Sequence, residues 1–353
     1  MSDTMNSAAV EEAIRILGRY GLADSQVEVF GTGLINDTFL VTVDPQQKFV
    51  LQRLNAMFKA EINRDIDALT RHLALKGSVT QRLIPADNGD LWVTEHDRIW
   101  RFSTYVPGVC YTMLESPAQA AAAGDLLARF HSDVSDFRVE LHQRRLGVHD
   151  TARHLRTLRD TLDEHASHRN FKAVAVIAEE ILATADELPA LPALPDRLVH
   201  GDPKISNLVF DAATGEGVCM IDLDTLAYMP LPLEMGDAIR SWCNPRGEDT
   251  QRSEFRVDLF EAAIGAYAAR ARTFVLPAEW RVFVLAARTI MIELAARFAT
   301  DALRESYFGW NSSLFADRST HNQVRAAGQL ELYRSLCASL DEAEELVANA
   351  FAA

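Results

Sequence analysis

Three residues with oxygen ligands follow one another at spacings suited to phosphoryl transfer. Asp202 and Asn207 lie in the segment HGDPKISN (200–207), which has the pattern His-x-Asp-x4-Asn. Two apolar runs follow, at 208–210 and 218–221, and Asp222 comes directly after the second. If these two runs pair as a hairpin, Asp222 returns beside Asn207. Phosphoryl transfer needs a carboxylate that takes the proton of the acceptor hydroxyl, and hard oxygen ligands for Mg²⁺. Asp202 fits the first role, and Asn207 with Asp222 fits the second.

The same residues also have a purely structural explanation, in which they take no part in catalysis. A His-Gly-Asp turn followed by an Asn-capped hairpin would leave the acidic residues solvated, as a lone Asp usually is. The joint order and spacing is much rarer than any one residue, and it therefore favours the catalytic interpretation. His200 and Asp224 are predicted to support the site, and Asp224 is also a candidate for a second metal contact.

Two glycines lie in a turn between predicted strands near the N-terminus. Gly31-Thr32-Gly33 would let the backbone approach the oxygens of a triphosphate closely. A hairpin turn needs glycine for its own geometry, so the motif alone is more often structural. Its position before a strand, a helix and the His-Gly-Asp loop favours the phosphate-binding interpretation.

The elements that must position these residues fall into two regions. In the first region, a helix ends at Gly21, and the patterns predict strands at 27–30, 38–43, 49–54, 91–94 and 99–102 and a helix at 62–73. In the second region, helices are predicted at 117–137, 171–188, 255–272, 279–303 and 323–352, with strands at 198–199, 208–210 and 218–221. We expect an antiparallel-sheet lobe at residues 1–104 and a mainly helical lobe at 105–353.

Composition and charge narrow the class of protein. The chain has 353 residues, 48% of them hydrophobic, and a formal net charge of -15, which argues against a nucleic-acid-binding surface. Its four cysteines lie far apart with no metal-ligand spacing, which is typical of reduced thiols. The N-terminal residues show no secretory signal, and Arg288 interrupts the most apolar stretch, at 282–292. We expect a soluble cytoplasmic protein with no membrane partner.

Around these motifs the chain resembles the aminoglycoside phosphotransferase and choline kinase superfamily, in which His-x-Asp-x4-Asn is followed by Ile-Asp at a strand end. Within it the chain is most similar to the N-acetylhexosamine 1-kinase group. The matching segments are GTGLINDTFLV (31–41), FVLQRLN (49–55), HGDPKISNLVFD (200–211), IDLDT (221–225), GDAIR (236–240), IELAARFATDALRESYF (292–308) and HNQVRAAGQLEL (321–332). This resemblance, over roughly residues 25–340, implies an α+β, protein-kinase-like fold of two lobes.

The resemblance also implies roles for individual residues and ATP with Mg²⁺ as cofactors. Asp202 would be the catalytic base, and Asn207 and Asp222 the metal ligands. The residues implied to bind ATP are Gly31, Thr32, Gly33 and Asn36 over the phosphates and the hinge at Tyr105 and Val106. Those implied to bind the acceptor are Arg297 and, as second candidates, Asn36, Asp37 and Asp237, together with Asp202. From spacing alone, Arg297 would instead form a helix-surface salt bridge with Glu293 at i−4.

Two positions depart from the expected patterns. Kinase folds place a Lys on the third strand to hold the α- and β-phosphates, whereas this strand reads Phe49-Val50-Leu51-Gln52-Arg53. Arg53 is predicted to take that role, with Glu61 or Asp65 as its ion-pair partner. Strand alternation puts Gln52 and Arg53 on opposite faces. Leu34 occupies the position of a His in the N-acetylhexosamine kinases, so a different acceptor stays open.

The leading prediction is phosphoryl transfer from ATP·Mg²⁺ to the anomeric hydroxyl of an N-acetylhexosamine or a related sugar. A second possibility keeps the same chemistry on an amino alcohol, an aminoglycoside or another sugar. A third is a catalytically inactive kinase fold that acts as a binding module, for which the missing strand Lys is the one argument.

Overall fold

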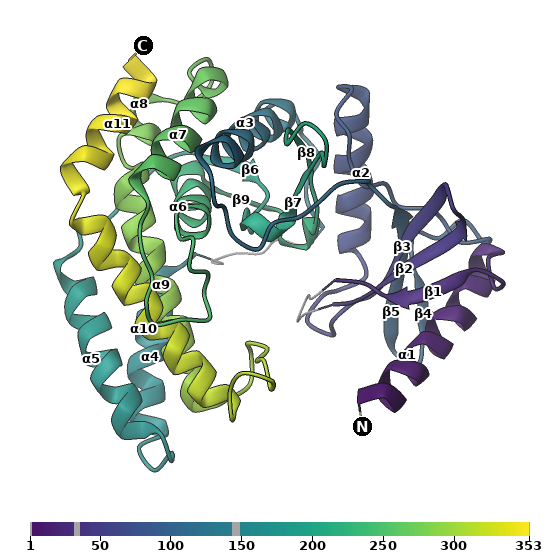
Figure 1. Cartoon of the computed structure of the whole chain (residues 1–353), viewed down its shortest axis with the longest axis horizontal. Helices are drawn as coiled ribbons and strands as arrows, with labels where there is room; N and C mark the ends of the chain where they lie inside the picture. Colours follow the sequence, from purple (N-terminus) through teal and green to yellow (C-terminus); the bar gives the residue numbers. More distant parts are fainter. Residues whose placement is uncertain (1, 32–35, 143–148, 353) are drawn as a thin grey trace. The chain divides into compact units, whose positions relative to one another are not determined.

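The computed structural model describes residues 2–31, 36–142 and 149–352. The chain divides into two compact units (Figure 1). Unit 1 contains Met1–Pro107 and Asp136–Arg144, and unit 2 contains Gly108–Ser135 and Arg145–Ala353. The segment 136–142 thus belongs to unit 1, although it follows the first long helix of unit 2.

Unit 1 is built on an antiparallel sheet of five strands. Its order is β1 (Gln26–Val29), β2 (Asp37–Asp44), β3 (Gln47–Arg53), β5 (Arg98–Thr104) and β4 (Val93–Glu95). Residues of one face alternate with those of the other, as the pleat requires. One face is apolar and forms a core with helix α1 (Ser2–Leu17), whose members include Ala13, Ile16, Leu17, Phe39, Val41, Leu51, Trp100 and Phe102.

Helix α2 (Ile62–Leu75) has the face that its sequence predicts. Ile62, Ile66, Leu69 and Leu73 are all buried, at the spacings of four, three and four that one side of a helix gives. The five predicted strands and this helix are therefore confirmed, with ends that differ by a few residues.

Unit 2 is mainly helical. Its helices are α3 (Pro117–Val134), α4 (Thr151–Glu164), α5 (Phe171–Glu187), α6 (Leu231–Trp242), α7 (Val257–Ala271), α8 (Pro277–Trp280), α9 (Phe283–Arg304), α10 (Arg318–Cys337) and α11 (Leu340–Ala352). Helix α3 packs on α7, while α4, α5, α6 and α10 pack on α9, which places α9 at the centre of this bundle (Figure 1). Gly236 permits the close crossing of α6 and α9, because a Cβ there would lie 2.7 Å from the backbone of Ala286.

Two small antiparallel pairs interrupt the helices of unit 2. Strand β6 (Asp196–Val199) pairs with β9 (Ala227–Pro230), and β7 (Leu208–Phe210) pairs with β8 (Gly217–Met220). The predicted hairpin is the second pair, with Leu208 opposite Met220.

Several helical predictions needed correction. The predicted helix at 323–352 is two helices, α10 and α11, with a break at residues 338–339. The predicted helix at 279–303 begins at Phe283, after the separate short turn α8. Helices α4 and α6 and strand β9 were not among the predicted elements. Within the described part of the chain, no helix is both long and apolar enough to cross a bilayer.

Candidate active site

The loop that carries Asp202 begins with a tight turn after β6. Gly201 has φ = +83°, and a Cβ at this position would lie 2.0 Å from the carbonyl oxygen of Thr225. Only glycine fits this backbone position, because the left-handed conformation and the close approach both exclude a side chain. The Thr225 hydroxyl donates to the carbonyl oxygen of His200 at 2.9 Å, which fixes the turn from the same side.

Helix α6 holds the same loop from the other side. The two carboxylate oxygens of Glu234 accept hydrogen bonds from the backbone N–H groups of His200 (2.9 Å) and Gly201 (2.8 Å). Further along the helix, the Ser241 hydroxyl accepts from the backbone N–H of Ile205, and the Trp242 indole donates to the carbonyl of Pro203. The loop backbone is therefore fixed along residues 200–205.

Glu234 is a fully buried carboxylate that stays ionised. Burial raises its pKa, but the hydrogen bond and charge of His131, with the further contacts at His200 and Gly201, outweigh burial, so the pKa lies below its usual value. His131 Nε2 lies 3.4 Å from Glu234 Oε1, and its Nδ1 lies 2.9 Å from the Tyr267 hydroxyl. The negative charge of Glu234 is therefore buried against the backbone of residues 200 and 201, without contact to water.

His200 ties the loop to the strand that ends at Asp222. Its Nε2 lies 2.9 Å from the carbonyl oxygen of Ile221, and the backbone N–H of Asp202 donates to its Nδ1 at 3.4 Å. Burial lowers the pKa of His200, which is completely enclosed. The neutral ring with its hydrogen on Nε2 satisfies both contacts.

Asp202 lies between a cation and an amide. Lys204 Nζ donates to Asp202 Oδ2 at 2.5 Å, and Asn207 Nδ2 donates to the same oxygen at 3.1 Å and to the Asp202 carbonyl at 2.9 Å. Burial raises the pKa of Asp202, but the charge and hydrogen bond of Lys204 outweigh burial and hold it below its usual value. Asp202 is therefore a carboxylate at neutral pH.

Lys204 is a site residue that the sequence analysis missed. Burial lowers its pKa, but the charges of Asp202 and Asp222 raise it by more, so the side chain is a stable ammonium. Its ammonium group therefore lies near both carboxylates. The signal was present in the sequence, since a lysine two residues after Asp202 is a cation on the same loop.

The predicted approach of Asp222 to Asn207 is confirmed. The backbone N–H of Ile221 donates to the carbonyl of Asn207 at 2.9 Å, which continues the β7–β8 pairing to the residue before Asp222. Asp222 has φ = +64°, a conformation that is uncommon for a residue with a side chain and is concentrated at functional sites. Asp224, two residues further on, is 1% exposed.

The residue types at positions 207 and 222 are suited to a magnesium ion. Asn207 uses its amide nitrogen on Asp202, and this leaves the amide oxygen as the ligand atom on its other side. One carboxylate and one amide oxygen, with water and phosphate oxygens, are the ligands that Mg²⁺ prefers.

A second polar cluster of unit 2 is centred on Glu293 of α9. This carboxylate is 1% exposed and accepts from His149 Nδ1 at 2.9 Å and from the Thr151 hydroxyl at 2.6 Å. His154 Nε2, on α4, lies 3.9 Å from it. Burial raises the pKa of Glu293, but the His149 contact outweighs burial and lowers it.

Arg297 does not form the salt bridge that spacing alone favoured. Its guanidinium lies over the rings of Tyr307 (5.9 Å) and Phe308 (5.6 Å), while Glu293 bonds to His149 and Thr151. Among the described residues, Arg297 makes no hydrogen bond and no ion pair within 4.0 Å. Its charge is still close enough to help lower the pKa of Glu293.

Asp237, the other predicted acceptor contact on unit 2, is part of an ion-pair network. Its carboxylate accepts from Arg240 Nε at 2.8 Å, and Arg240 also contacts Glu248 at 2.5 Å. The charge of Arg240 lowers the pKa of Asp202, and the charge of Asp237 raises that of His149. The paired residues Asp237 and Arg240 are therefore coupled electrostatically to His149 and to Asp202, respectively.

In unit 1, the predicted ion-pair partner of Arg53 was wrong. Arg53 pairs with Glu12 of α1 and with Asp37, and its guanidinium lies 5.5 Å from the centre of the Trp100 ring. The register explains the difference, because Asp37 lies directly opposite Arg53 on the neighbouring strand. Neither Glu61 nor Asp65 takes this role, and Asp65 instead accepts from the His142 ring at 2.7 Å. The phosphate-binding role of Arg53 stays a prediction.

The opposite face of this sheet carries a cation that the sequence analysis did not select. Arg101 is 4% exposed and donates through Nε and Nη2 to Gln52 Oε1, at 2.9 and 2.7 Å. The amide nitrogen of Gln52 donates to the Thr38 hydroxyl at 3.1 Å. These three residues occupy adjacent positions on β2, β3 and β5.

The remaining predicted ATP contacts of unit 1 are partly described. Thr32, Gly33 and Leu34 lie outside the described residues. Gly31 has φ = +81°, and the Asn36 side chain accepts from the backbone N–H of Asn55 at 2.9 Å. The ring of Tyr105, which precedes Val106 at the end of this unit, lies edge-on to Phe30 at 6.0 Å.

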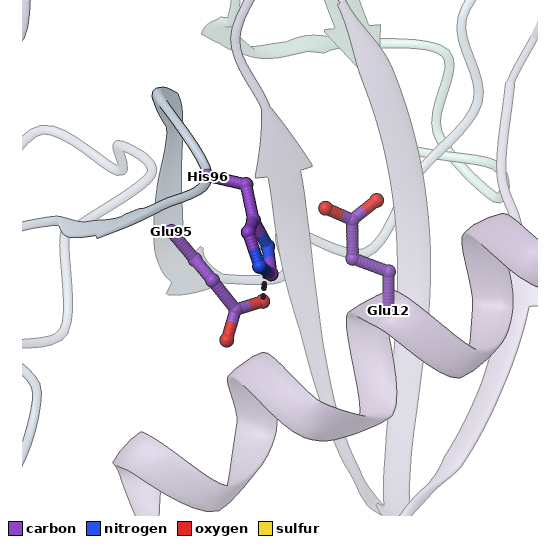
Figure 2. A group of neighbouring side chains, drawn as sticks. All are labelled: Glu12, Glu95 and His96. Carbon is purple, nitrogen blue, oxygen red and sulfur yellow. Dashed lines mark ion pairs between the residues drawn. The ribbon is translucent and has the colours of Figure 1, made fainter.

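Glu12, Glu95 and His96 form a group with the composition of a metal site (Figure 2). Their ligand atoms lie within 4.8 Å of one another. However, Glu12 is paired with Arg53, and Arg15 lies 4.0 Å from Glu95. Since two arginines already compensate these carboxylates, we assign no ion to this group.

Comparison with known proteins identifies the class to which this fold and site belong. The profile of the phosphotransferase enzyme family matches residues 26–273. Solved structures share the fold, among them a microcompartment-associated aminopropanol kinase (16% identity, TM-score 0.62, 94% of this chain and 98% of that chain covered). Choline kinase from Cryptosporidium parvum Iowa II (12%, 0.61, 96% and 99%) and a spectinomycin phosphotransferase in complex with ADP and spectinomycin (13%, 0.55, 96% and 98%) are further examples.

The chain thus belongs to the phosphotransferase enzyme family and has the two-lobed, protein-kinase-like α+β fold. It is an ATP-dependent phosphotransferase that acts on the alcohol group of a small molecule.

Proposed function

We propose that the acceptor is a neutral sugar, most simply an N-acetylhexosamine phosphorylated on its anomeric hydroxyl. The observation that carries this proposal is Arg297, a guanidinium without an ionic partner among the described residues, whose charge acts on the imidazole of His149. Cationic amino alcohols are bound by open aromatic faces and carboxylates. Here the guanidinium already covers the faces of Tyr307 and Phe308, and its charge repels an ammonium group.

In the proposed reaction, each residue of the catalytic loop has a separate task. Asp202 orients the acceptor hydroxyl and takes its proton, and the Lys204 ammonium stabilises negative charge on the transferred phosphoryl group. Asn207 and Asp222 would hold Mg²⁺, which supplies charge neutralisation at the phosphate oxygens. Glu234 and His200 fix the loop so that these groups need not reorganise during the reaction.

We further propose that unit 1 binds ATP and that Arg101, rather than Arg53, takes the place of the missing strand Lys. Arg53 is neutralised by Glu12 and Asp37 on the face that packs on α1. Arg101 lies on the other face of the sheet, where it donates to Gln52. A guanidinium binds phosphate oxygens through hydrogen bonds that its charge strengthens.

The second candidate is the same reaction on an amino alcohol or an aminoglycoside. The aminopropanol kinase and the spectinomycin phosphotransferase share this fold, so the fold permits such acceptors. The third, an inactive binding module, is disfavoured because Lys204 and Asn207 both donate to Asp202, and the charge of Lys204 holds the pKa of Asp202 below its usual value.

The test is ADP release with Mg²⁺·ATP and a panel of N-acetylhexosamines, other hexoses, amino alcohols and aminoglycosides. We expect turnover on a sugar, and a loss of about 10²- to 10⁴-fold in kcat for Asp202→Asn, which keeps the shape but removes the base. Turnover on amino alcohols alone would contradict the sugar assignment. Binding of ATP without turnover of any acceptor would favour the binding module.

A further inference from the structure

His149 is a buried histidine with only one of its two ring nitrogens satisfied by the described protein. Its side chain is 6% exposed. Nδ1 lies 2.9 Å from Glu293 Oε1, whereas Nε2 is shielded from solvent and has no hydrogen-bond partner among the described residues. A buried polar atom without a partner costs about 1–3 kcal/mol, so its retention requires an explanation.

The surroundings fix the orientation of this ring. Glu293 lies on α9, is itself buried and has its second oxygen occupied by the Thr151 hydroxyl at 2.6 Å. It therefore holds Nδ1 as a hydrogen-bond donor and leaves Nε2 as the ring nitrogen without a partner among the described residues. A carboxylate that fixes the tautomer of a histidine in this way leaves the other nitrogen to act on a ligand.

The position of His149 links it to the acceptor end of unit 2. Asp237 and Arg297 are both near enough for their charges to change the pKa of His149. Asp237 is bonded to Arg240, whose charge in turn acts on Asp202. Charge effects thus couple the ring to the Asp237–Arg240 pair, and charge effects couple this pair to Asp202.

We propose that His149 Nε2 donates a hydrogen bond to an uncharged oxygen of the acceptor, and that His149 is a specificity-determining residue for a polyhydroxylated substrate. This inference rests on the proposed function for the kind of acceptor, but it concerns a contact that the proposed function does not require.

The protonation state of the ring supports a donor role. Burial lowers the pKa of His149, but the hydrogen bond and charge of Glu293 outweigh burial and raise it above the ordinary value. Asp237 raises it further, Arg297 opposes this, and His154 of α4 also faces Glu293. His149 therefore keeps its second proton to a higher pH than an ordinary histidine, and Nε2 carries a hydrogen.

Two variants distinguish a contact between His149 and the acceptor from a purely structural role of His149. In His149→Asn the side-chain amide lies close to the position of Nδ1, so the bond to Glu293 is kept while the Nε2 donor is lost. We expect the acceptor KM to rise about tenfold or more, as for the loss of one buried hydrogen bond, while the KM for ATP stays the same. In His149→Gln the amide reaches the position of Nε2, and we expect much of the acceptor affinity to return.

The pH dependence gives a second readout. In the wild type, the acceptor KM is expected to rise as pH passes the raised pKa of His149, because Nε2 loses its hydrogen. This rise should be absent in His149→Asn and in the KM for ATP. The matched control is His168→Asn, which alters another His–Glu pair of unit 2, with Nε2 3.1 Å from Glu305, and should leave both KM values unchanged.

The outcomes distinguish this inference from the proposed function. If a sugar is turned over and His149→Asn keeps its acceptor KM, the inference is wrong and the sugar assignment stands. If only an amino alcohol is turned over and its KM rises in His149→Asn, the contact is supported but the assignment of a polyhydroxylated substrate is wrong. If no acceptor of the panel is turned over, both are overturned.

Discussion

A single buried carboxylate can determine how the loop that carries Asp202 is held in place. Glu234 and Glu279 are both completely buried glutamates of unit 2, but they do different work. Glu234 accepts the backbone N–H groups of His200 and Gly201, whereas Glu279 accepts two hydrogen bonds from Arg197 at 2.6 and 2.7 Å. Substituting each by glutamine removes a buried charge from unit 2, but only one of them touches the loop.

For Glu234→Gln we expect kcat to fall about 10- to 100-fold, since a misplacement of catalytic groups by about 1 Å can cost 10²-fold. The physical reason is that the amide nitrogen of glutamine cannot accept, so one of the two loop N–H groups loses its partner. Steady-state kinetics and thermal unfolding measure the two effects.

Glu279→Gln is the control for this change. It removes one partner of a buried ion pair, so it should lower the unfolding midpoint and leave kcat near the wild-type value. Equal losses of kcat in the two variants would show that Glu234 acts through general stability and not through the loop.

At the scale of secondary-structure elements, the register of the unit 1 sheet places Arg53 and Arg101 on opposite faces. Arg53 shares a face with Phe39, Leu51 and the α1 core, while Arg101 shares the other face with Gln52. Side chains alternate between the two faces of every strand, so Arg53 and Arg101 cannot make each other's contacts.

We expect Arg101→Met to raise the KM for ATP about tenfold or more, because one charged contact to phosphate contributes about 1.5–3 kcal/mol. Arg53→Met should mainly lower the unfolding midpoint, since it leaves Glu12 without its ion-pair partner on the α1 side. Nucleotide titrations and thermal unfolding of both variants test this. The reverse pattern would return the phosphate-binding role to Arg53.

For the whole molecule, the net charge of -15 opposes the binding of a triphosphate. Local cations and the metal ion must therefore provide the attraction that the overall charge does not. We propose Lys204 and Arg101 as two such cations, and Asn207 with Asp222 would hold the metal.

It follows that nucleotide should stabilise the protein mainly in the presence of Mg²⁺. With a non-hydrolysable ATP analogue at about 100 times its Kd, the expected gain in unfolding free energy is about 2.7 kcal/mol. Thermal unfolding with Mg²⁺ and with EDTA measures it. Asp222→Asn should remove most of this gain, and the control Asp211→Asn, a turn residue of the same hairpin that accepts from Ala213 and Thr214, should not. A full gain in EDTA would contradict the metal assignment.

Much of the fold and of the loop that carries Asp202 could be predicted from the sequence, because the spacings and periodicities that define them involve neighbouring residues. The spacing of Asp202 and Asn207 lies within one loop, and Asp222 follows a hairpin of short strands, so neighbouring residues set their geometry. The same holds for the face of α2, which the helical period gives directly. Lys204 was readable in the same way and was overlooked.

Other features depended on packing between distant segments. Sequence alone could not give Arg53 its partner Glu12, 41 residues away, or give Gly201 its partner Glu234, 33 residues away. The contact between His149 and Glu293 spans 144 residues and requires the segment before α4 to pack on α9. Strand and helix periods state only which residues share a face. Which faces meet is decided by the burial of the whole core. The sequence by itself therefore determined which polar residues the Asp202 loop brings together, whereas the tertiary structure decided what supports this loop and which buried histidine is the candidate acceptor contact.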